Sequence, residues 1–381
     1  MRNRSVMIAL GLLVAGTSAA RAQGVIRQIE SDNTAYGTTA AEFLLVPASA
    51  RGAALGGGFA AIVTDVSSVH YNPAGLALMP RPGLLASQMN YVADTRYSWL
   101  AIGMPFSGGS RAIGLSVTNF GFSDQPVYTV EDPQGELGEV YSVSQTALGF
   151  TYSQQFSDRF SAGMTFKFIN DRLGDVVGRA FAVDFGTSFR ASVGGRPIRA
   201  AFVIQNLGSS LRHEGSALDV LVNREPPLDQ QDVPQEPARA RLSTKEWSLP
   251  VIFRVSMAYD LFATQSSRFS VLGEFTQPNN TEPAVNFAGE YSMNLGGSGF
   301  QLAGRLGWTT QPDNNLDPAG PSSPNYAGFE STVSDGSDGL SAGGGLRWQR
   351  DPRGIGISFD YAYRHLGVLG SVNMITVGLN W

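Results

Sequence analysis

Apolar residues alternate with small or polar residues along most of the chain beyond residue 83. In one such segment the apolar positions are Ile355, Ile357, Phe359, Tyr361 and Tyr363, and glycine, serine, aspartate, alanine and arginine occupy the positions after them. The same two-residue period recurs within residues 162–168, 181–189, 253–261 and 300–308. Because successive side chains of a β-strand point to opposite faces, this period predicts strands with one apolar, aromatic face.

We expect about fourteen strands between Leu84 and Trp381, most of them near the ~9 to 11 residues that a tilted membrane-spanning strand needs. Their expected starts are Leu84, Tyr97, Arg111, Tyr141, Phe160, Gly178, Ile198, Leu249, Phe269, Ala284, Phe300, Leu340, Ile355 and Val372. The fold class that this pattern predicts is all-β, an antiparallel transmembrane β-barrel over residues 83–381.

The connections between the expected strands give an independent test of the barrel. The links after even-numbered strands are short, for example "SGGS", "SDR" and "TQSS", whereas the long links at 121–140, 208–248 and 309–339 all follow odd-numbered strands. Outer-membrane barrels have short turns on the periplasmic side and longer loops outside. A soluble sandwich has no reason to follow that parity.

A secreted β-sandwich or β-solenoid is the alternative, because alternation alone does not separate a core-facing row from a lipid-facing row. The face opposite the apolar row favours a barrel, since it combines small residues with mixed charges. These inward charges are Lys167, Asp184, Arg254, Glu274, Glu290, Arg305, Arg347 and Asp360. A barrel of about fourteen strands is too wide for side chains alone to fill, so its lumen must hold water, a plug or a ligand.

The first 22 residues have the pattern of a secretory signal peptide. Arg2 and Arg4 precede a short apolar run, and Ala20-Arg21-Ala22 forms a small-residue cleavage site. Removal of the three arginines in residues 1–22 changes the formal charge from -5 to -8, which argues against a nucleic-acid partner. The chain contains no cysteine, so the exported protein folds without disulfides.

Residues 23–82 lack the strand pattern and predict a compact, partly helical hatch joined directly to the first strand. Within it, Asn72 is suited to cap a short helix that has Pro73 at its first position, where the missing N–H costs nothing. Arg51 and Asp65 are expected to form a charge pair. Such a segment is well placed to fold back into the lumen.

This segment also carries a family resemblance. The run "P-x-S-A-R-G-x-A-L-G-G" from Pro47, then Asp65, then "Y-N-P-A-G-L-A" from Tyr71 resembles the amino-terminal motif of the PorV/PorQ family, which is itself similar to the FadL group of outer-membrane transporters. "QNLG" from Gln205 resembles a second family segment. The hatch residues to which the resemblance points are Arg51, Gly56, Gly57, Asp65, Asn72, Pro73, Ala74 and Gly75.

The resemblance implies a fourteen-stranded barrel with an N-terminal hatch in the cell outer membrane. PorV and PorQ relatives serve type IX protein secretion and surface attachment, where the partner is a cargo protein with a C-terminal signal domain or a surface protein. The long acidic, proline-rich links favour such a protein partner, and we take this as the main functional hypothesis. The alternative is a FadL-like channel for the uptake of hydrophobic small molecules.

Enzymatic chemistry has no recognisable residue pattern here. "LGGGF" lacks the Lys-Ser/Thr of a phosphate-binding loop, and no cysteine is available as a nucleophile. His70, His213 and His365 are scattered, without a second ligand at metal spacing. Glu274 and Glu290 are expected on neighbouring strands, where they balance lumen arginines. We therefore expect no cofactor, no metal and no catalytic residue.

The C-terminus ends on Trp381, in the apolar row formed with Ile375, Val377 and Leu379. This ending resembles the signal by which barrel-insertion machinery recognises its clients. The expected contacts of the barrel are therefore outer-membrane lipid around its apolar face and the insertion machinery during assembly.

Overall fold

A computed structural model describes residues 37–130, 132–136, 138–222, 237–310, 339–351 and 354–381. The expected signal peptide, residues 1–22, and residues 23–36 of the expected hatch lie outside the described residues. No helix within the described ranges is long and apolar enough to cross a membrane.

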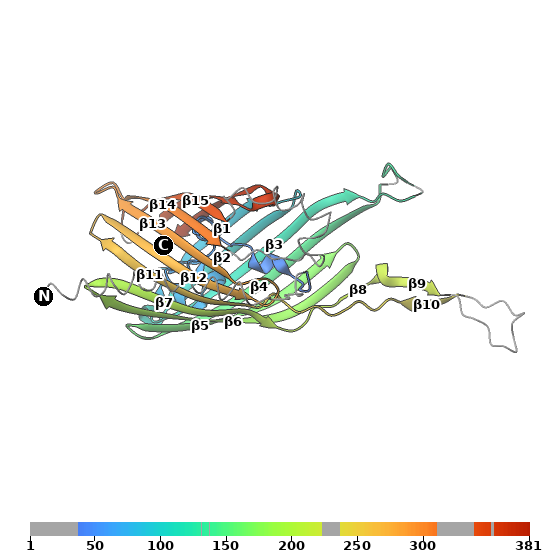
Figure 1. The fold of residues 1–381 in the computed structure, drawn as a ribbon, viewed down its shortest axis with the longest axis horizontal. Coiled ribbons are helices and arrows are strands. Elements are labelled where there is room, and N and C mark those ends of the chain that lie inside the picture. The colour runs from blue at the N-terminus through green and yellow to red at the C-terminus, as the bar shows by residue number, and fades with distance from the viewer. Residues whose placement is uncertain (1–36, 131, 137, 223–236, 311–338, 352–353) are drawn as a thin grey trace, which may run out of the picture. The chain divides into compact units, whose positions relative to one another are not determined.

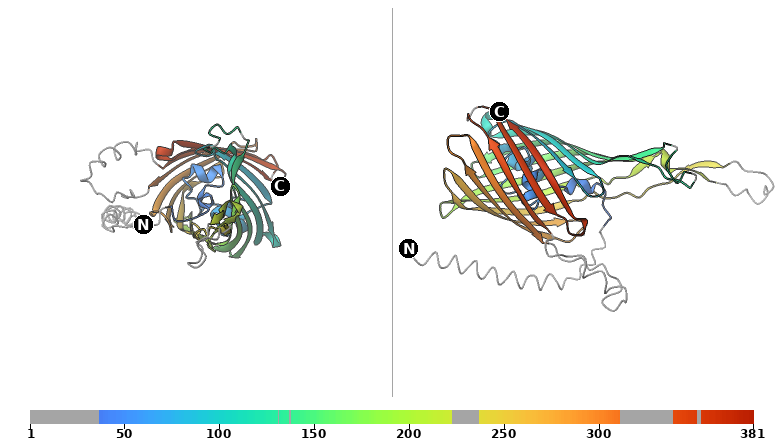
Figure 2. Two further views of the ribbon diagram at one scale, coloured as in Figure 1. Left: turned by 90° about the vertical axis from the view of Figure 1, so that its right-hand side faces the viewer. Right: turned by 90° about the horizontal axis from the view of Figure 1, so that it is seen from above.

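The described residues from Gly37 onward form a closed antiparallel β-barrel (Figures 1 and 2). The barrel strands in the first half are β1 (Gly83–Asn90), β2 (Arg96–Phe106), β3 (Arg111–Pro126), β4 (Val140–Ser157), β5 (Phe160–Leu173), β6 (Val176–Val193) and β7 (Arg196–Gly208). Those in the second half are β11 (Ile252–Ala263), β12 (Ser267–Pro278), β13 (Ala284–Asn294), β14 (Phe300–Thr310), β15 (Leu340–Trp348), β16 (Gly356–His365) and β17 (Ser371–Asn380).

Pairing between the first and last strands closes the sheet. β1 pairs with β17 from Gly83 opposite Asn380 to Asn90 opposite Asn373, and β5 pairs with β6 along its whole length. The sheet has 15 strands, but β8 (His213–Gly215) pairs only with β6, so the closed barrel within the described residues has 14. Both the strand number and the fold class agree with the sequence prediction, and each strand starts within three residues of its expected position.

The outer face of the barrel carries the large apolar side chains. Leu115, Phe150, Phe181, Phe202 and Leu306 are all more than 45% exposed, as expected for a surface whose solvent is lipid hydrocarbon. Trp381 is 47% exposed, and its backbone N–H donates to the Pro82 carbonyl at 3.2 Å. Its use as an assembly signal stays a prediction.

Several elements extend past the barrel on the side of its long links (Figure 1). β4 and β6 are 18 residues long, about 60 Å at the usual strand rise, which exceeds the length needed to cross a bilayer. The link between β7 and β11 contains β8, the turn η4 (Ser216–Leu218) and a hairpin of β9 (Asp219–Val222) with β10 (Ala238–Arg241). The sequence predicted only an irregular link there, because strands this short leave no measurable period.

Residues 37–82, which we call the inner segment, lie inside the barrel (Figure 2). They form η1 (Glu42–Leu45), α2 (Ala50–Ala54), α3 (Ser68–Tyr71) and η2 (Pro73–Leu78). Leu55, Phe59 and Leu76 of this segment share one buried apolar cluster with Trp99 of β2 and Met374 of β17. The remaining helical turns are η3 (Ser107–Gly109) and η5 (Gly367–Leu369).

Candidate functional site

Asn72 fixes the start of η2 against the barrel wall. Its side-chain oxygen accepts from the Ala74 N–H at 3.1 Å, with Pro73 in the first helical turn. Its amide group donates to the carbonyls of Ala60 at 3.0 Å and Thr187 at 3.1 Å. The expected cap is therefore confirmed, and the same completely buried side chain also joins two parts of the inner segment to β6.

A pair of glycines on neighbouring wall strands receives the Asn72–Pro73 turn. Gly163 of β5 and Gly186 of β6 are directly opposite each other in the sheet. A Cβ added at Gly163 would lie 2.5 Å from the Pro73 carbonyl carbon, and one at Gly186 would collide with the Asn72 side chain. Ser153 and Ser161 donate to the Ala74 carbonyl at 3.2 and 3.1 Å beside them. The turn therefore fits only where the wall lacks side chains.

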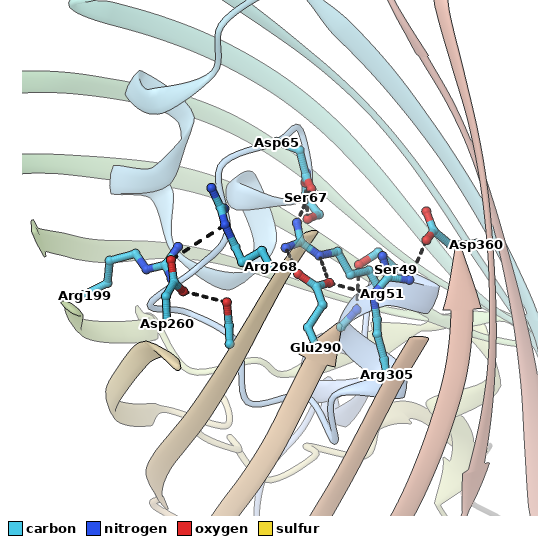
Figure 3. Close-up of polar contacts among 12 residues, drawn as sticks. Ser49, Arg51, Asp65, Ser67, Arg199, Asp260, Arg268, Glu290, Arg305 and Asp360 are labelled. Atoms are coloured by element: carbon cyan, nitrogen blue, oxygen red, sulfur yellow. Dashed lines mark hydrogen bonds and ion pairs between the residues drawn. The ribbon is translucent and has the colours of Figure 1, made fainter. Parts of the chain in front are cut away.

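Arg51 of α2 is the centre of an ion-pair network on the opposite wall, drawn in Figure 3. Its guanidinium binds Asp65 at 3.0 Å, which confirms the expected pair, and binds Glu290 of β13 through two bonds of 2.8 Å. Arg305 of β14 also binds Glu290, at 2.7 Å, and Asp360 of β16, at 2.6 Å. Burial opposes the charge of Arg51, but Glu290 and Asp65 outweigh it and raise its pKa above the ordinary value.

The Arg305–Asp360 pair spans β15, which lies between β14 and β16. A Cβ at Gly345 of β15 would lie 2.9 Å from a nitrogen of Arg305 and would also collide with Asp360. Gly343, two residues earlier, similarly allows Ala54 of α2 to approach the wall. The glycine run of β15 thus makes room both for the ion pair and for the inner segment.

Four of the other inward charges also form pairs. Lys167 of β5 binds Asp184 of β6 at 2.7 Å, and Arg254 of β11 binds Glu274 of β12 at 3.0 Å. Glu274 and Glu290, noted as possible partners of lumen arginines, each have one.

The remaining predicted hatch residues shape the backbone of the inner segment. Gly56 and Gly57 follow α2 with φ of 71° and 86°, a left-handed conformation that glycine adopts without cost. The Gly57 N–H closes the helix end on the Gly52 carbonyl at 2.8 Å. A Cβ at Gly75 would collide with the Val63 carbonyl, so this glycine allows two stretches of the inner segment to touch.

His70 and His213 have different neighbours. His70 in α3 is half-buried, with its ring edge-on to Tyr71 at 4.7 Å, and desolvation together with the charges of Lys167 and Arg254 lowers its pKa well below the ordinary value. His213 lies 3.4 Å from Asp171. Among the described residues no group of three or more potential ligands could hold a metal ion.

A cavity of about 470 Å³ opens at the long-link end of the barrel. Its apolar lining comes from Phe43 and Val46 of the inner segment, from Tyr91 and Phe120 of the wall, and from Trp247 of the β10–β11 connection. Phe43 stacks on Phe120 with ring centroids 6.5 Å apart. The inner segment therefore contributes part of the lining of an aromatic pocket.

A second cavity of about 290 Å³ lies toward the short-turn end. Arg51, Asp65 and Arg81 of the inner segment meet residues of β12 to β17 around it. Eight of its lining residues are charged, whereas the aromatic pocket has two carboxylates, Glu42 and Asp171. The two cavities contact different parts of the inner segment.

Sequence reasoning did not identify Gly163, Gly186 or Gly345, or the part that Phe43 and Trp247 play in the aromatic pocket. The "AGGGL" run at 342–346 was the available signal for close approach at β15. The pairing of Gly163 with Gly186 depends on strand register, which the sequence pattern does not give.

Comparison with known proteins finds solved structures with a similar fold. No protein-family model matches the chain. No curated protein matches it. Among solved structures, the toluene transporter TbuX of Ralstonia pickettii is similar with a TM-score of 0.50 and 11% identity, over 89% of this chain and 98% of that one. A FadL homologue of Pseudomonas aeruginosa has a TM-score of 0.46 and 11% identity, over 88% and 99% of the two chains.

The toluene transporter TodX of Pseudomonas putida has a TM-score of 0.47 and 9% identity, with 87% of this chain and 96% of that chain covered. At such identities the likeness to TbuX shows the fold alone. The fold is the FadL-like outer-membrane β-barrel. The PorV/PorQ resemblance of residues 47–77 stays a prediction.

Proposed function

We propose that this protein is a non-enzymatic outer-membrane channel for small hydrophobic molecules, closed at rest by the inner segment acting as a hatch. The aromatic pocket at the long-link end carries this proposal. By the loop rule for outer-membrane barrels, that end faces outside the cell. The alternative that the sequence raised thereby becomes the main hypothesis.

The pocket has the size and chemistry of a small-molecule site. Its volume of about 470 Å³ is within the range of roughly 300–1,000 Å³ typical of ligand pockets. Phe43, Phe120 and Trp247 offer aromatic surface, and burial of apolar ligand surface contributes about 25 cal/mol per Å². Glu42 and Asp171 also line the pocket, so an apolar molecule without negative charge is the ligand that this lining favours.

The inner segment lies on the route from this pocket to the short-turn end. Phe43 lines the aromatic pocket, and Arg51, eight residues later, lines the second cavity. Leu55, Phe59 and Leu76 are buried between them. Passage through the lumen therefore requires the inner segment to move, and the Arg51–Glu290 pair is one of the contacts that must break.

We propose no enzyme role because the inward carboxylates are paired with cationic side chains. Each of Asp184, Glu274 and Glu290 is bound by an arginine or lysine. TbuX, a toluene transporter with a similar fold, supports a channel role.

Uptake by whole cells tests the proposal. Cells that express this protein in a host lacking related channels should accumulate a radiolabelled monoaromatic hydrocarbon faster than cells with an empty vector. Phe43→Ser and Trp247→Ser should reduce the gain several-fold, because each removes aromatic lining. Tyr128→Ser, on an exposed part of the β3–β4 link, is the matched control and should leave uptake unchanged. Uptake equal to that of the empty-vector cells would refute the channel role.

A second candidate is the type IX secretion role implied by the PorV/PorQ resemblance. The observation that favours it is the β9–β10 hairpin beyond the barrel, on which Leu221 is 70% exposed. An exposed ribbon of this kind could contact a cargo or surface protein. Mass spectrometry of surface and medium proteins with and without the gene would decide, since this role requires loss of proteins with a shared C-terminal domain.

A further inference from the structure

The cavity at the short-turn end has an unbalanced charge. Five arginines line it, against three carboxylates: the lining charges are Arg51, Arg81, Arg268, Arg305 and Arg347 with Asp65, Glu290 and Asp360. The surplus is two positive charges. Nearby Asp260 does not change it, because Arg199 binds that carboxylate together with Arg268.

Arg81, Arg268 and Arg347 have no carboxylate partner among the residues that line the cavity. Arg51 and Arg305 are committed to the ion-pair network described above, and Arg81 donates to the Gly354 carbonyl at 3.0 Å. Arg268 is 3.7 Å from its shared partner Asp260 and 55% exposed. Arg347 is exposed and forms no ion pair within the described residues. Both guanidinium groups therefore retain donors for another acceptor.

The wall between these two arginines carries the small residues Ser292 and Ala303, whereas the space over Gly345 is occupied by the Arg305–Asp360 pair. Arg268 is opposite Ser292 in the sheet, Ser292 is opposite Ala303, and Ala303 is opposite Gly345. Arg347 lies two residues beyond Gly345, opposite Ser358. Three small side chains thus separate the arginines across the strands, and the serines add neutral hydroxyl donors.

We infer that this cavity binds a small oxyanion, a carboxylate or a phosphate group, between Arg268 and Arg347. Guanidinium groups present paired N–H donors that match both oxyanions. The cavity walls concentrate the field of the surplus charge and raise the local concentration of anions. The inference is independent of the proposed transport role, because the closed barrel already contains the cavity.

Equilibrium dialysis of the purified full-length protein in detergent tests the inference with three radiolabelled probes at low salt: inorganic phosphate, benzoate and the uncharged benzamide. We expect saturable one-site binding of phosphate, benzoate or both, and at least tenfold weaker binding of benzamide. Binding of phosphate alone would identify a phosphate-bearing ligand, and binding of benzoate alone a carboxylate. Both results support an oxyanion site.

Variants locate the site. Arg268→Gln with Arg347→Gln should weaken anion binding at least tenfold, and the double lysine variant should retain more of it because the charge remains. Arg239→Gln removes one exposed arginine of β10 and should bind as the natural protein does. Heat-dependent gel migration establishes that each variant is folded. No saturable anion binding, or equal binding by the double glutamine variant, would overturn the inference.

Discussion

Asn72 illustrates how one buried side chain holds the inner segment in place. Replacement by alanine removes three hydrogen bonds, to Ala74, Ala60 and Thr187. At about 1 kcal/mol for each bond, the closed position of the η2 turn should lose about 2–3 kcal/mol. Hydrogen exchange of residues 60–78, followed by mass spectrometry, measures this loss as faster local opening.

The matched control for Asn72→Ala is Asn294→Ala, which removes one exposed hydrogen bond to Gln265. It should leave exchange in residues 60–78 unchanged. Equal exchange in the natural protein and the Asn72→Ala variant would show that the turn is held by packing and not by this side chain.

Gly186 is needed because the inner segment touches the wall there. A valine would push against Asn72 and Pro73 and should displace the turn, whereas the lipid-facing row of β6 is unchanged and the barrel should still form. We expect liposomes that contain Gly186→Val to admit small sugars faster in a swelling assay. Gly304→Val, where nothing lies within 4 Å of an added Cβ, should remain as tight as the natural protein. Equal tightness of both variants would contradict the close fit.

At the residue scale the sequence predicted contacts within the inner segment but not those between the segment and the wall. Arg51 and Asp65 are 14 positions apart, and Asn72 caps its own helix, so local spacing was informative. Glu290 is 239 positions from Arg51. Such a contact depends on strand register and on barrel closure, and neither is encoded in a single local pattern.

Among the contacts that attach the inner segment to the barrel, two differ in kind. The Asn72 turn fits against glycines of β5 and β6 through neutral hydrogen bonds, whereas α2 is tied to β13 by the charge of Arg51. Glu290 keeps Arg305 when Arg51 leaves, so the wall does not lose its own pairing. This asymmetry makes the α2 side the easier one to release.

Arg51→Gln tests that asymmetry. Loss of the Glu290 and Asp65 pairs should destabilise the closed position of α2 by about 2 kcal/mol, a value reduced for the partial exposure of these side chains. Hydrogen exchange should speed up in residues 50–66 and stay unchanged in residues 70–78. Arg239→Gln serves as the control, and a uniform increase through both ranges would contradict two separate attachments.

For the strands, the two-residue period was sufficient to predict their positions, because contact with the bilayer requires an apolar outward face. A lipid-facing position cannot be polar without cost, so the outward row of β6 is apolar from Phe181 onward except at Thr187. Beyond the membrane that requirement ends. The end of β3 beyond residue 120 and the β9–β10 hairpin therefore gave no clear period and were predicted as links.

At the scale of the whole molecule, the barrel combines a lipid-facing apolar surface with a lumen filled by its own N-terminal part. The aromatic pocket at one end and the cationic cavity at the other are separated by the buried core of the inner segment. Such packing would block a permanently open pore. We therefore propose that the inner segment must move before a small molecule can pass through the lumen.

Locking that segment in a defined position is the most direct test. The chain contains no cysteine, so Ala50→Cys with Thr376→Cys introduces the only thiols, at positions joined by a 2.8 Å hydrogen bond between α2 and β17. We would measure uptake of a radiolabelled monoaromatic hydrocarbon by proteoliposomes before and after reduction of this disulfide. While the disulfide is intact we expect uptake at the rate of protein-free liposomes, and after its reduction we expect uptake to recover. Equal uptake in both states would contradict the proposal.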